Sequence, residues 1–243
     1  MKMNFLFILF FILSCTTKPT ENEGKENSIT DTVSDMTILD EPIGPNTEII
    51  EAFADSLNIG KKGKTKIELI KLRVFDDFYV IVKFYTQGPN YWYHQNTYLY
   101  ECTALMSFEP NISDFNNDKF NDITFISATA ARGVNEVRRL FIYDDSEKKL
   151  TSIVNSESYP NMLYNQELDC IDAFLVTGGS STVFARIEGD SLKEFARVHN
   201  DNYRTVYEVD RFGKKQLLRK DTIINLDTYV RYINFKPLKA YKD

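Results

Sequence analysis

Histidine and cysteine carry much of the nucleophilic, acid–base and metal chemistry of proteins. This chain of 243 residues has only two histidines and three cysteines. His94 and His199 lie far apart, without the spacing that metal ligands show. The chain has no phosphate-binding loop, no dinucleotide-binding fingerprint and no pair of Cys-x-x-Cys motifs. Because no catalytic constellation emerges, we expect that the protein is not an enzyme.

A cluster of basic residues is also missing. Asp and Glu outnumber Lys and Arg by 35 to 29, and the formal net charge is −6. Since binding to nucleic acid needs a basic face, this composition argues against nucleic acid as a partner. The acidity is either a solubility feature or a means of meeting a basic partner.

The one long apolar run, residues 5–13, is too short to cross a bilayer as a stable helix. Lys2 precedes this run, and Ser14 and Cys15 follow it. A charged start, an apolar stretch and a small residue predict a signal peptide over residues 1–14. The four residues that end at Cys15 resemble the lipobox of bacterial lipoproteins, which implies that Cys15 is lipidated. An ordinary secretory signal with an incidental cysteine is the alternative.

Residues 15–46 are rich in Thr, Glu, Asn, Ser, Lys and Pro and have few large apolar side chains. Such a segment cannot bury enough surface to offset its ordering entropy, so we expect a flexible, lipid-anchored tether. Residues 47–243 have the size of one domain. The sequence therefore predicts a lipid-anchored protein of the bacterial cell envelope, located at the outer membrane or in the periplasm.

Alternating apolar and polar residues dominate this domain. Residues 66–75 and 78–85 show the pattern of two strands around an Asp76-Asp77 turn, and strand-like segments recur to residue 219. We expect a mainly β fold: an antiparallel meander that forms a partial β-propeller or a sandwich. Residues 47–57 have apolar side chains at helical intervals and predict one short N-terminal helix.

Cys102 and Cys170 form an even pair if Cys15 carries lipid. In an oxidising compartment the two predict a disulfide bond, and two separate buried small side chains are the alternative. The sequence leaves both open, because it does not show whether the two Cα atoms approach each other.

An acidic loop, residues 114–122, is the most informative motif. Its oxygen-bearing side chains fall at relative positions 1, 3, 5 and 9, and the Phe120 carbonyl stands at position 7. Calcium takes six to eight oxygen ligands, and this spacing folds a short loop around such an ion. The motif predicts a calcium site with these ligands: Asp114, Asn116, Asp118, Phe120 and Asp122.

The loop departs from an EF-hand at two positions. Lys119 replaces the usual Gly at position 6, and Phe125 stands where an EF-hand has Glu at position 12. An Asn/Asp-rich surface turn is the alternative, since both residue types favour turns. A structural ion is favoured over a catalytic one, because no acid or base is recognisable beside the loop.

The order of motifs resembles the XAC2610-related family of small secreted or lipid-anchored bacterial β proteins. The acidic loop precedes a strand that ends at Tyr143-Asp144, then a Gly/Ser-containing strand pair over 174–187 and a short hairpin at 189–192. The resemblance covers about residues 108–220. It implies a lysozyme-inhibitor-like partial propeller in which calcium holds a loop.

The same resemblance implies a binding role, in which a protruding loop enters the cleft of a cell-wall hydrolase. The four residues that we expect to form this loop are small and flexible: Gly178, Gly179, Ser180 and Ser181. Residues 132–135 are the second candidate, and a plain hairpin turn is the alternative for each. A different function, a glycan- or peptide-binding surface lipoprotein, is suggested by the aromatic run at residues 91–94, unless that run packs against the core.

Overall fold

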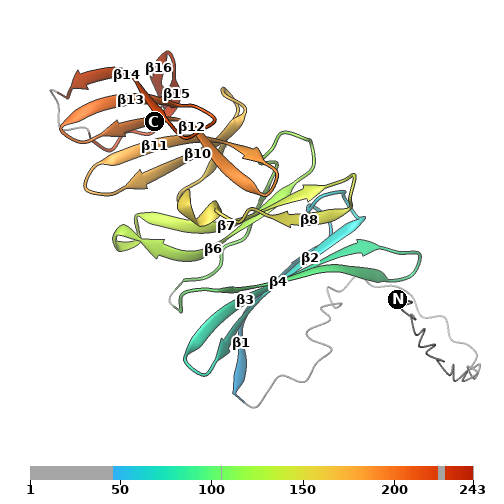
Figure 1. Ribbon diagram of the computed structural model, residues 1–243. Coiled ribbons are helices and arrows are strands. Elements are labelled where there is room, and N and C mark those ends of the chain that lie inside the picture. The colour runs from blue at the N-terminus through green and yellow to red at the C-terminus, as the bar shows by residue number, and fades with distance from the viewer. Residues whose placement is uncertain (1–45, 105, 224–227, 243) are drawn as a thin grey trace, which may run out of the picture. The chain divides into compact units, whose positions relative to one another are not determined.

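The computed structural model describes residues 46–104, 106–223 and 228–242. The predicted signal peptide, Cys15 and all but the last residue of the predicted tether lie outside these ranges. Within them the chain forms sixteen strands and two single-turn 3-10 helices (Figure 1). No helix in this part of the chain is both long and apolar enough to cross a membrane.

The first sheet is an antiparallel meander whose four strands pair in the order of the chain. The hairpin predicted around residues 76 and 77 is present, with Val74 paired to Asp77. The strands of this sheet are β1 (Thr47–Asp55), β2 (Thr65–Val74), β3 (Asp77–Gln87) and β4 (Trp92–Glu101).

Strand β1 occupies the segment for which the sequence predicts a helix, and that prediction is wrong. A β-bulge between Ile49 and Glu51 shifts the register of β1 against β2. The extra residue, Ile50, places apolar side chains at intervals that imitate a helix, although β1 is paired along its length. Phe53 packs against the core, and Glu51 accepts hydrogen bonds from the residue 107–108 segment at 2.6 and 3.1 Å.

The second and third sheets repeat this plan. The second sheet contains β5 (Asn111–Ser113), β6 (Asp122–Ala130), β7 (Asn135–Asp144) and β8 (Lys149–Ser152), in chain order. The helix η1 (Ala131–Gly133) joins β6 to β7, and η2 (Ser156–Ser158) follows β8.

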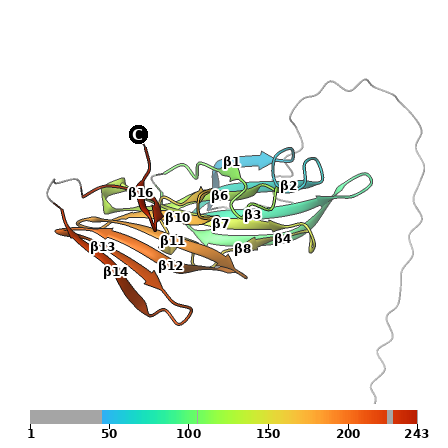
Figure 2. The same cartoon turned by 90° about the horizontal axis from the view of Figure 1, so that it is seen from above.

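The third sheet has six strands in reverse chain order, β14 to β9. They are β9 (Leu163–Asn165), β10 (Cys170–Val176), β11 (Ser180–Glu188), β12 (Ser191–Asn200), β13 (Tyr203–Val209) and β14 (Lys215–Thr222). A C-terminal hairpin of β15 (Tyr232–Phe235) and β16 (Leu238–Ala240) follows. Figure 2 shows β13 and β14 curving away from the other strands.

The sheets stack face to face, and each interface holds one apolar cluster (Figure 1). The first cluster joins the first and second sheets, the second joins the second and third sheets, and the third joins the third sheet to the C-terminal hairpin. The fold is therefore mainly β with antiparallel sheets that do not close, as the sequence predicts apart from the helix.

The two cysteines of the domain lie in different layers. Cys102 packs against the first cluster, Cys170 belongs to the third, and both thiols are free. Of the two alternatives that the sequence leaves open, the structure shows separate packed thiols in place of a disulfide bond. Burial raises the pKa of Cys170 to about 12.

A buried carboxylate attaches the C-terminal hairpin to the third sheet. Asp172 on β10 is fully buried and forms an ion pair with Arg231, whose Nε donates to Asp172 Oδ1 at 2.7 Å. Tyr241 Oη and Asn165 Nδ2 donate to Oδ2 at 2.5 and 3.0 Å. Burial and the hydrogen bond to Asp172 raise the pKa of Tyr241 above its ordinary value.

Replacing Arg231 with alanine leaves the Asp172 charge buried without its counter-ion. We expect the free energy of unfolding, measured by chemical denaturation, to fall by about 3–5 kcal/mol. Arg219→Ala is the control, because Arg219 pairs with Asp221 on an exposed edge and should cost about 0–1 kcal/mol. Equal losses in the two variants would show that the buried pair does not hold the hairpin.

Candidate functional site

The acidic loop connects β5 to β6 and is attached to the segment between β1 and β2. Gly60 N donates to the Asn121 carbonyl at 2.8 Å, and Asn121 Nδ2 donates to the Asn58 carbonyl at 2.9 Å. On the other side of these contacts, Asp55 Oδ1 accepts the amide of Ile59 at 2.9 Å. The loop is therefore held between the first and second sheets.

Asp114 organises the first half of the loop through backbone amides. Its Oδ1 accepts the amides of Asn116 and Asp118 at 3.2 and 3.3 Å, and its Oδ2 accepts the amide of Lys119 at 2.9 Å. Lys119 has a φ of 75° and Asn117 a φ of 60°. A lysine thus makes the bend for which EF-hand loops use glycine, at a steric cost of about 1–2 kcal/mol.

Asn116 and Asp118 complete the group of side chains that face one another in the loop. Asn116 Nδ2 donates to Asp118 Oδ2 at 2.8 Å, and Asp118 Oδ1 accepts the amide of Phe120 at 2.8 Å. The loop therefore brings two carboxylates and one side-chain amide together, and carboxylate and amide oxygens suit a hard cation. In the described part of the chain, no group of three or more His, Cys, Asp or Glu side chains is arranged to hold a metal ion.

Asp122, the last of the predicted ligands, has a structural role in the fold. Its side chain is fully buried, and its two oxygens accept the amides of Phe115 and Tyr143 at 2.8 and 2.9 Å. Burial raises its pKa to about 8, and the nearby charges of Asp118 and Asp114 act in the same direction. Asp122 therefore ties the start of the loop to β7, with a backbone amide on each of its oxygens.

Two phenylalanines anchor the loop in different layers. Phe115 is buried in the second cluster, and Phe120 packs against the first, with its ring edge-on to Tyr143 at 5.6 Å between centroids. Core packing and the hydrogen bonds of Asp122 therefore hold both ends of the loop.

The loop predicted at residues 178–181 does not protrude. Ser180 and Ser181 are buried within β11, and only Gly178 of the four residues is exposed. A Cβ atom on Gly179 would lie 2.2 Å from the Asn200 carbonyl, so this glycine permits close packing. The segment is a tight hairpin turn, which is the alternative that the sequence left open.

Ser181 takes part in a hydrogen-bonded chain with two residues of the β12 end. Its Oγ lies 2.8 Å from His199 Nδ1, and His199 Nε2 lies 3.5 Å from Asp201 Oδ2. Ser181 and His199 are paired in register on neighbouring strands, and none of the three side chains lines a cavity described below. The hydrogen bond between Ser181 and His199 fastens β11 to β12. Because Ser181 is only 4% exposed, a substrate would have no access to its hydroxyl group.

The β13–β14 hairpin has the exposed tip that the sequence analysis missed. Asp210 Oδ1 accepts the amides of Phe212 and Lys214, both at 2.9 Å, and Gly213 has a φ of 79°. Phe212 at this tip is 80% exposed, and the Arg211 guanidinium lies 4.7 Å from its ring centroid. In the sequence, a large apolar residue placed between Arg and Gly in a turn was the feature that indicated an exposed aromatic side chain.

The aromatic run at residues 91–94 lies near the tip of the β3–β4 hairpin, with Tyr91 in the turn and the other three residues at the start of β4. Tyr91 and Tyr93 are 58% and 42% exposed, with ring centroids 4.4 Å apart and hydroxyl groups 2.6 Å apart. Neither tyrosine belongs to an apolar cluster of the described residues. These two rings are available at the surface.

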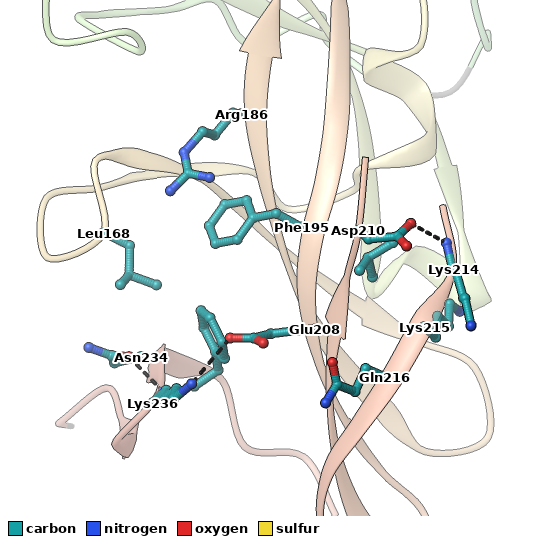
Figure 3. A pocket seen from close by; sticks show the side chains of 12 residues that line it. Leu168, Arg186, Phe195, Glu208, Asp210, Lys214, Lys215, Gln216, Asn234 and Lys236 are labelled. Carbon is teal, nitrogen blue, oxygen red and sulfur yellow. Dashed lines mark hydrogen bonds and ion pairs between the residues drawn. The ribbon is translucent and has the colours of Figure 1, made fainter. Parts of the chain in front are cut away.

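A cavity of about 680 Å³ lies beside the C-terminal hairpin, over the face of β11 to β14 (Figure 3). Its side chains combine apolar, basic and acidic groups: Leu168, Arg186, Phe195, Glu208, Val209, Asp210, Lys214, Lys215, Gln216, Asn234, Phe235 and Lys236. Arg186 also lines two further cavities, of about 640 and 150 Å³. The smallest includes Asn116 of the acidic loop, so Arg186 stands where these hollows meet.

Comparisons with known proteins add little to this geometry. No protein-family model matches the chain, and neither does any curated protein. A solved structure of a protein described as Xanthomonas type IV secretion system related aligns with 8% identity and a TM-score of 0.44, over 74% of this chain and 96% of that one. At this level of similarity, function must be argued from the residues of the chain itself.

Asp122→Asn tests the structural role of this carboxylate. Asparagine offers one acceptor where two backbone amides donate, so one amide is left facing a second donor. In denaturant titrations at a pH above the pKa of Asp122, where the group is a carboxylate, we expect the free energy of unfolding to fall by about 1–3 kcal/mol, equally with calcium and with chelator. Asp76→Asn, in an exposed turn, should leave stability unchanged. A loss that appears only in calcium would instead make Asp122 a ligand.

Proposed function

We propose that this chain is an extracytoplasmic lipoprotein of the bacterial envelope that binds a protein partner and inhibits a cell-wall hydrolase. The signal peptide and lipobox pattern of residues 1–15 support the location. The observation that carries the binding role is the β13–β14 tip, where the 80% exposed Phe212 stands among cationic side chains.

The tip has the chemistry that a glycosidase cleft would accept. Such enzymes place a pair of Asp or Glu side chains in a groove, and removing water from that groove strengthens any charge pair formed in it. Arg211 and Lys214 flank Phe212 in the sequence and supply positive charges to the tip, and Asp210 fixes the turn. An aromatic anchor with neighbouring arginine is also the usual composition of an interface hot spot.

We also propose that the acidic loop binds calcium through Asp114, Asn116, Asp118 and the Phe120 carbonyl. Two carboxylates four residues apart repel each other, and a cation between them would offset that repulsion. With Asp122 turned into the core, the chain offers four ligands, and water would fill the other positions. The role of the ion is structural, because the loop is attached to two sheets and faces no reacting group.

Calcium binding predicts a shift in thermal unfolding. At 100 times its dissociation constant, calcium should raise the Tm by about 5–10 °C relative to chelator. Asp118→Asn removes one charged ligand and should abolish the shift, whereas Asp190→Asn in the β11–β12 turn, outside the predicted ligand set, should retain it. The same Tm in calcium and in chelator for the unmodified protein would make the loop an ordinary turn.

The hairpin tip predicts inhibition of a hydrolase. With a purified lysozyme as the probe, lysis of bacterial cell walls should be inhibited, and Phe212→Ala should weaken this inhibition about tenfold or more. Leu57→Ala is the control, because Leu57 is 62% exposed and lies outside the hairpin. If the unmodified protein leaves every tested lysozyme fully active, the hydrolase-inhibitor role is wrong.

A glycan-binding role is the second candidate, and the exposed Tyr91–Tyr93 pair favours it. Aromatic faces at a hairpin tip can stack on sugar rings. Direct binding of a soluble chitin oligosaccharide to the purified protein, measured without any lysozyme present, would support this role over inhibition.

A further inference from the structure

The 680 Å³ cavity combines an apolar floor with an open side, a size and shape typical of small-molecule sites. Phe195 forms the centre of the floor, with its ring centroid 6.0 Å from that of Phe235 and 6.3 Å from that of Phe184. Leu168 lies on the opposite side of the opening in Figure 3. A ligand in this space would therefore place an apolar group against Phe195.

The acidic side chains of the cavity are already engaged. Glu208 lies 3.5 Å from Lys236 Nζ, and Asp210 accepts the amides of the hairpin turn. Arg186, in contrast, forms no ion pair within the described ranges, and its guanidinium stacks 4.1 Å from the Phe195 ring centroid. The positive charge of Arg186 is therefore free to meet a ligand.

A second cation lies directly opposite Arg186. Strand pairing places Arg186 on β11 against Lys193 on β12, and Lys193 lines the adjoining cavity. Like charges opposite each other on neighbouring strands destabilise a sheet, and no described acidic side chain forms an ion pair with either residue. An anion bound between them would remove that repulsion, in a chain whose net charge is −6.

We propose that this cavity binds a small carboxylate that carries an apolar group on the neighbouring carbon, as an apolar amino acid with a free carboxyl group does. The carboxylate lies against Arg186, which lines both this cavity and the adjoining one, on the side where Lys193 lines the adjoining cavity. The apolar group packs on Phe195 between Leu168 and Phe235. The Gln216 side chain, which lines the cavity and makes no hydrogen bond within the described residues, offers a further polar contact.

This site goes beyond the proposed inhibitor role, because its anchoring residues lie on β11 and β12 and not at the β13–β14 tip. Saturation-transfer NMR on the purified protein tests it with N-acetyl-L-phenylalanine and with the amide of the same compound. These probes share one shape and differ in charge. We expect the acid to bind about tenfold more tightly than the amide.

Arg186→Gln should remove the preference for the acid, and Lys193→Gln should reduce it. Arg219→Gln is the matched control, because it removes an arginine of the same sheet that already pairs with Asp221. Thermal unfolding of each variant shows whether it is folded. Equal binding of acid and amide by the unmodified protein, no binding of either at millimolar concentration, or an unchanged preference in folded Arg186→Gln would overturn the proposal.

Discussion

Strand β7 contributes to two apolar clusters at once, and the stacking of the whole domain depends on this. Phe141 and Tyr143 point into the first cluster, whereas Leu140 and Ile142 point into the second. Because side chains alternate along a strand, a shift of the β7 pairing register by one residue would exchange the two sets of side chains. Neither set would then fit the cluster that it faces. The third sheet repeats the arrangement, with Val183 in the second cluster and Phe184 in the third. The register of the central strands thus fixes how all the layers meet.

Two buried carboxylates complement this apolar packing at the junctions between segments. Asp122 connects the acidic loop to β7 through two backbone amides, and Asp172 connects β10 to the C-terminal hairpin through Arg231 and Tyr241. A buried carboxylate is tolerated only where donors satisfy it, so each one specifies its partner segment. The two sites that we propose lie near these junctions. The acidic loop is held at one, and the cavity beside Phe195 lies at the edge of the other.

A sequence pattern reports residue types but not burial, and the structure supplies burial for each predicted residue. Oxygen-bearing side chains at positions 1, 3, 5 and 9 of the loop look equivalent in sequence, yet Asp122 opens β6 and faces the core. The Gly178–Ser181 segment has the composition of an exposed loop, but Ser180 and Ser181 already belong to β11. Conversely, nothing in the sequence pattern marks Arg186 and Lys193 as a pair. Only the register of β11 against β12 places them opposite each other.

Local patterns alone determined the mainly β class, the hairpin between β2 and β3, and the place of the acidic loop, because alternation and turn chemistry act over a few residues. The signal peptide and lipid anchor at Cys15 are equally local predictions. Tertiary structure decided the rest. A bulge at Ile50 converts an apparently helical pattern into strand β1, and sheet stacking separates Cys102 from Cys170. The cavity exists only because β11 to β14 pack beside a hairpin that starts at Tyr232, and contacts between such distant segments leave no local pattern in the sequence.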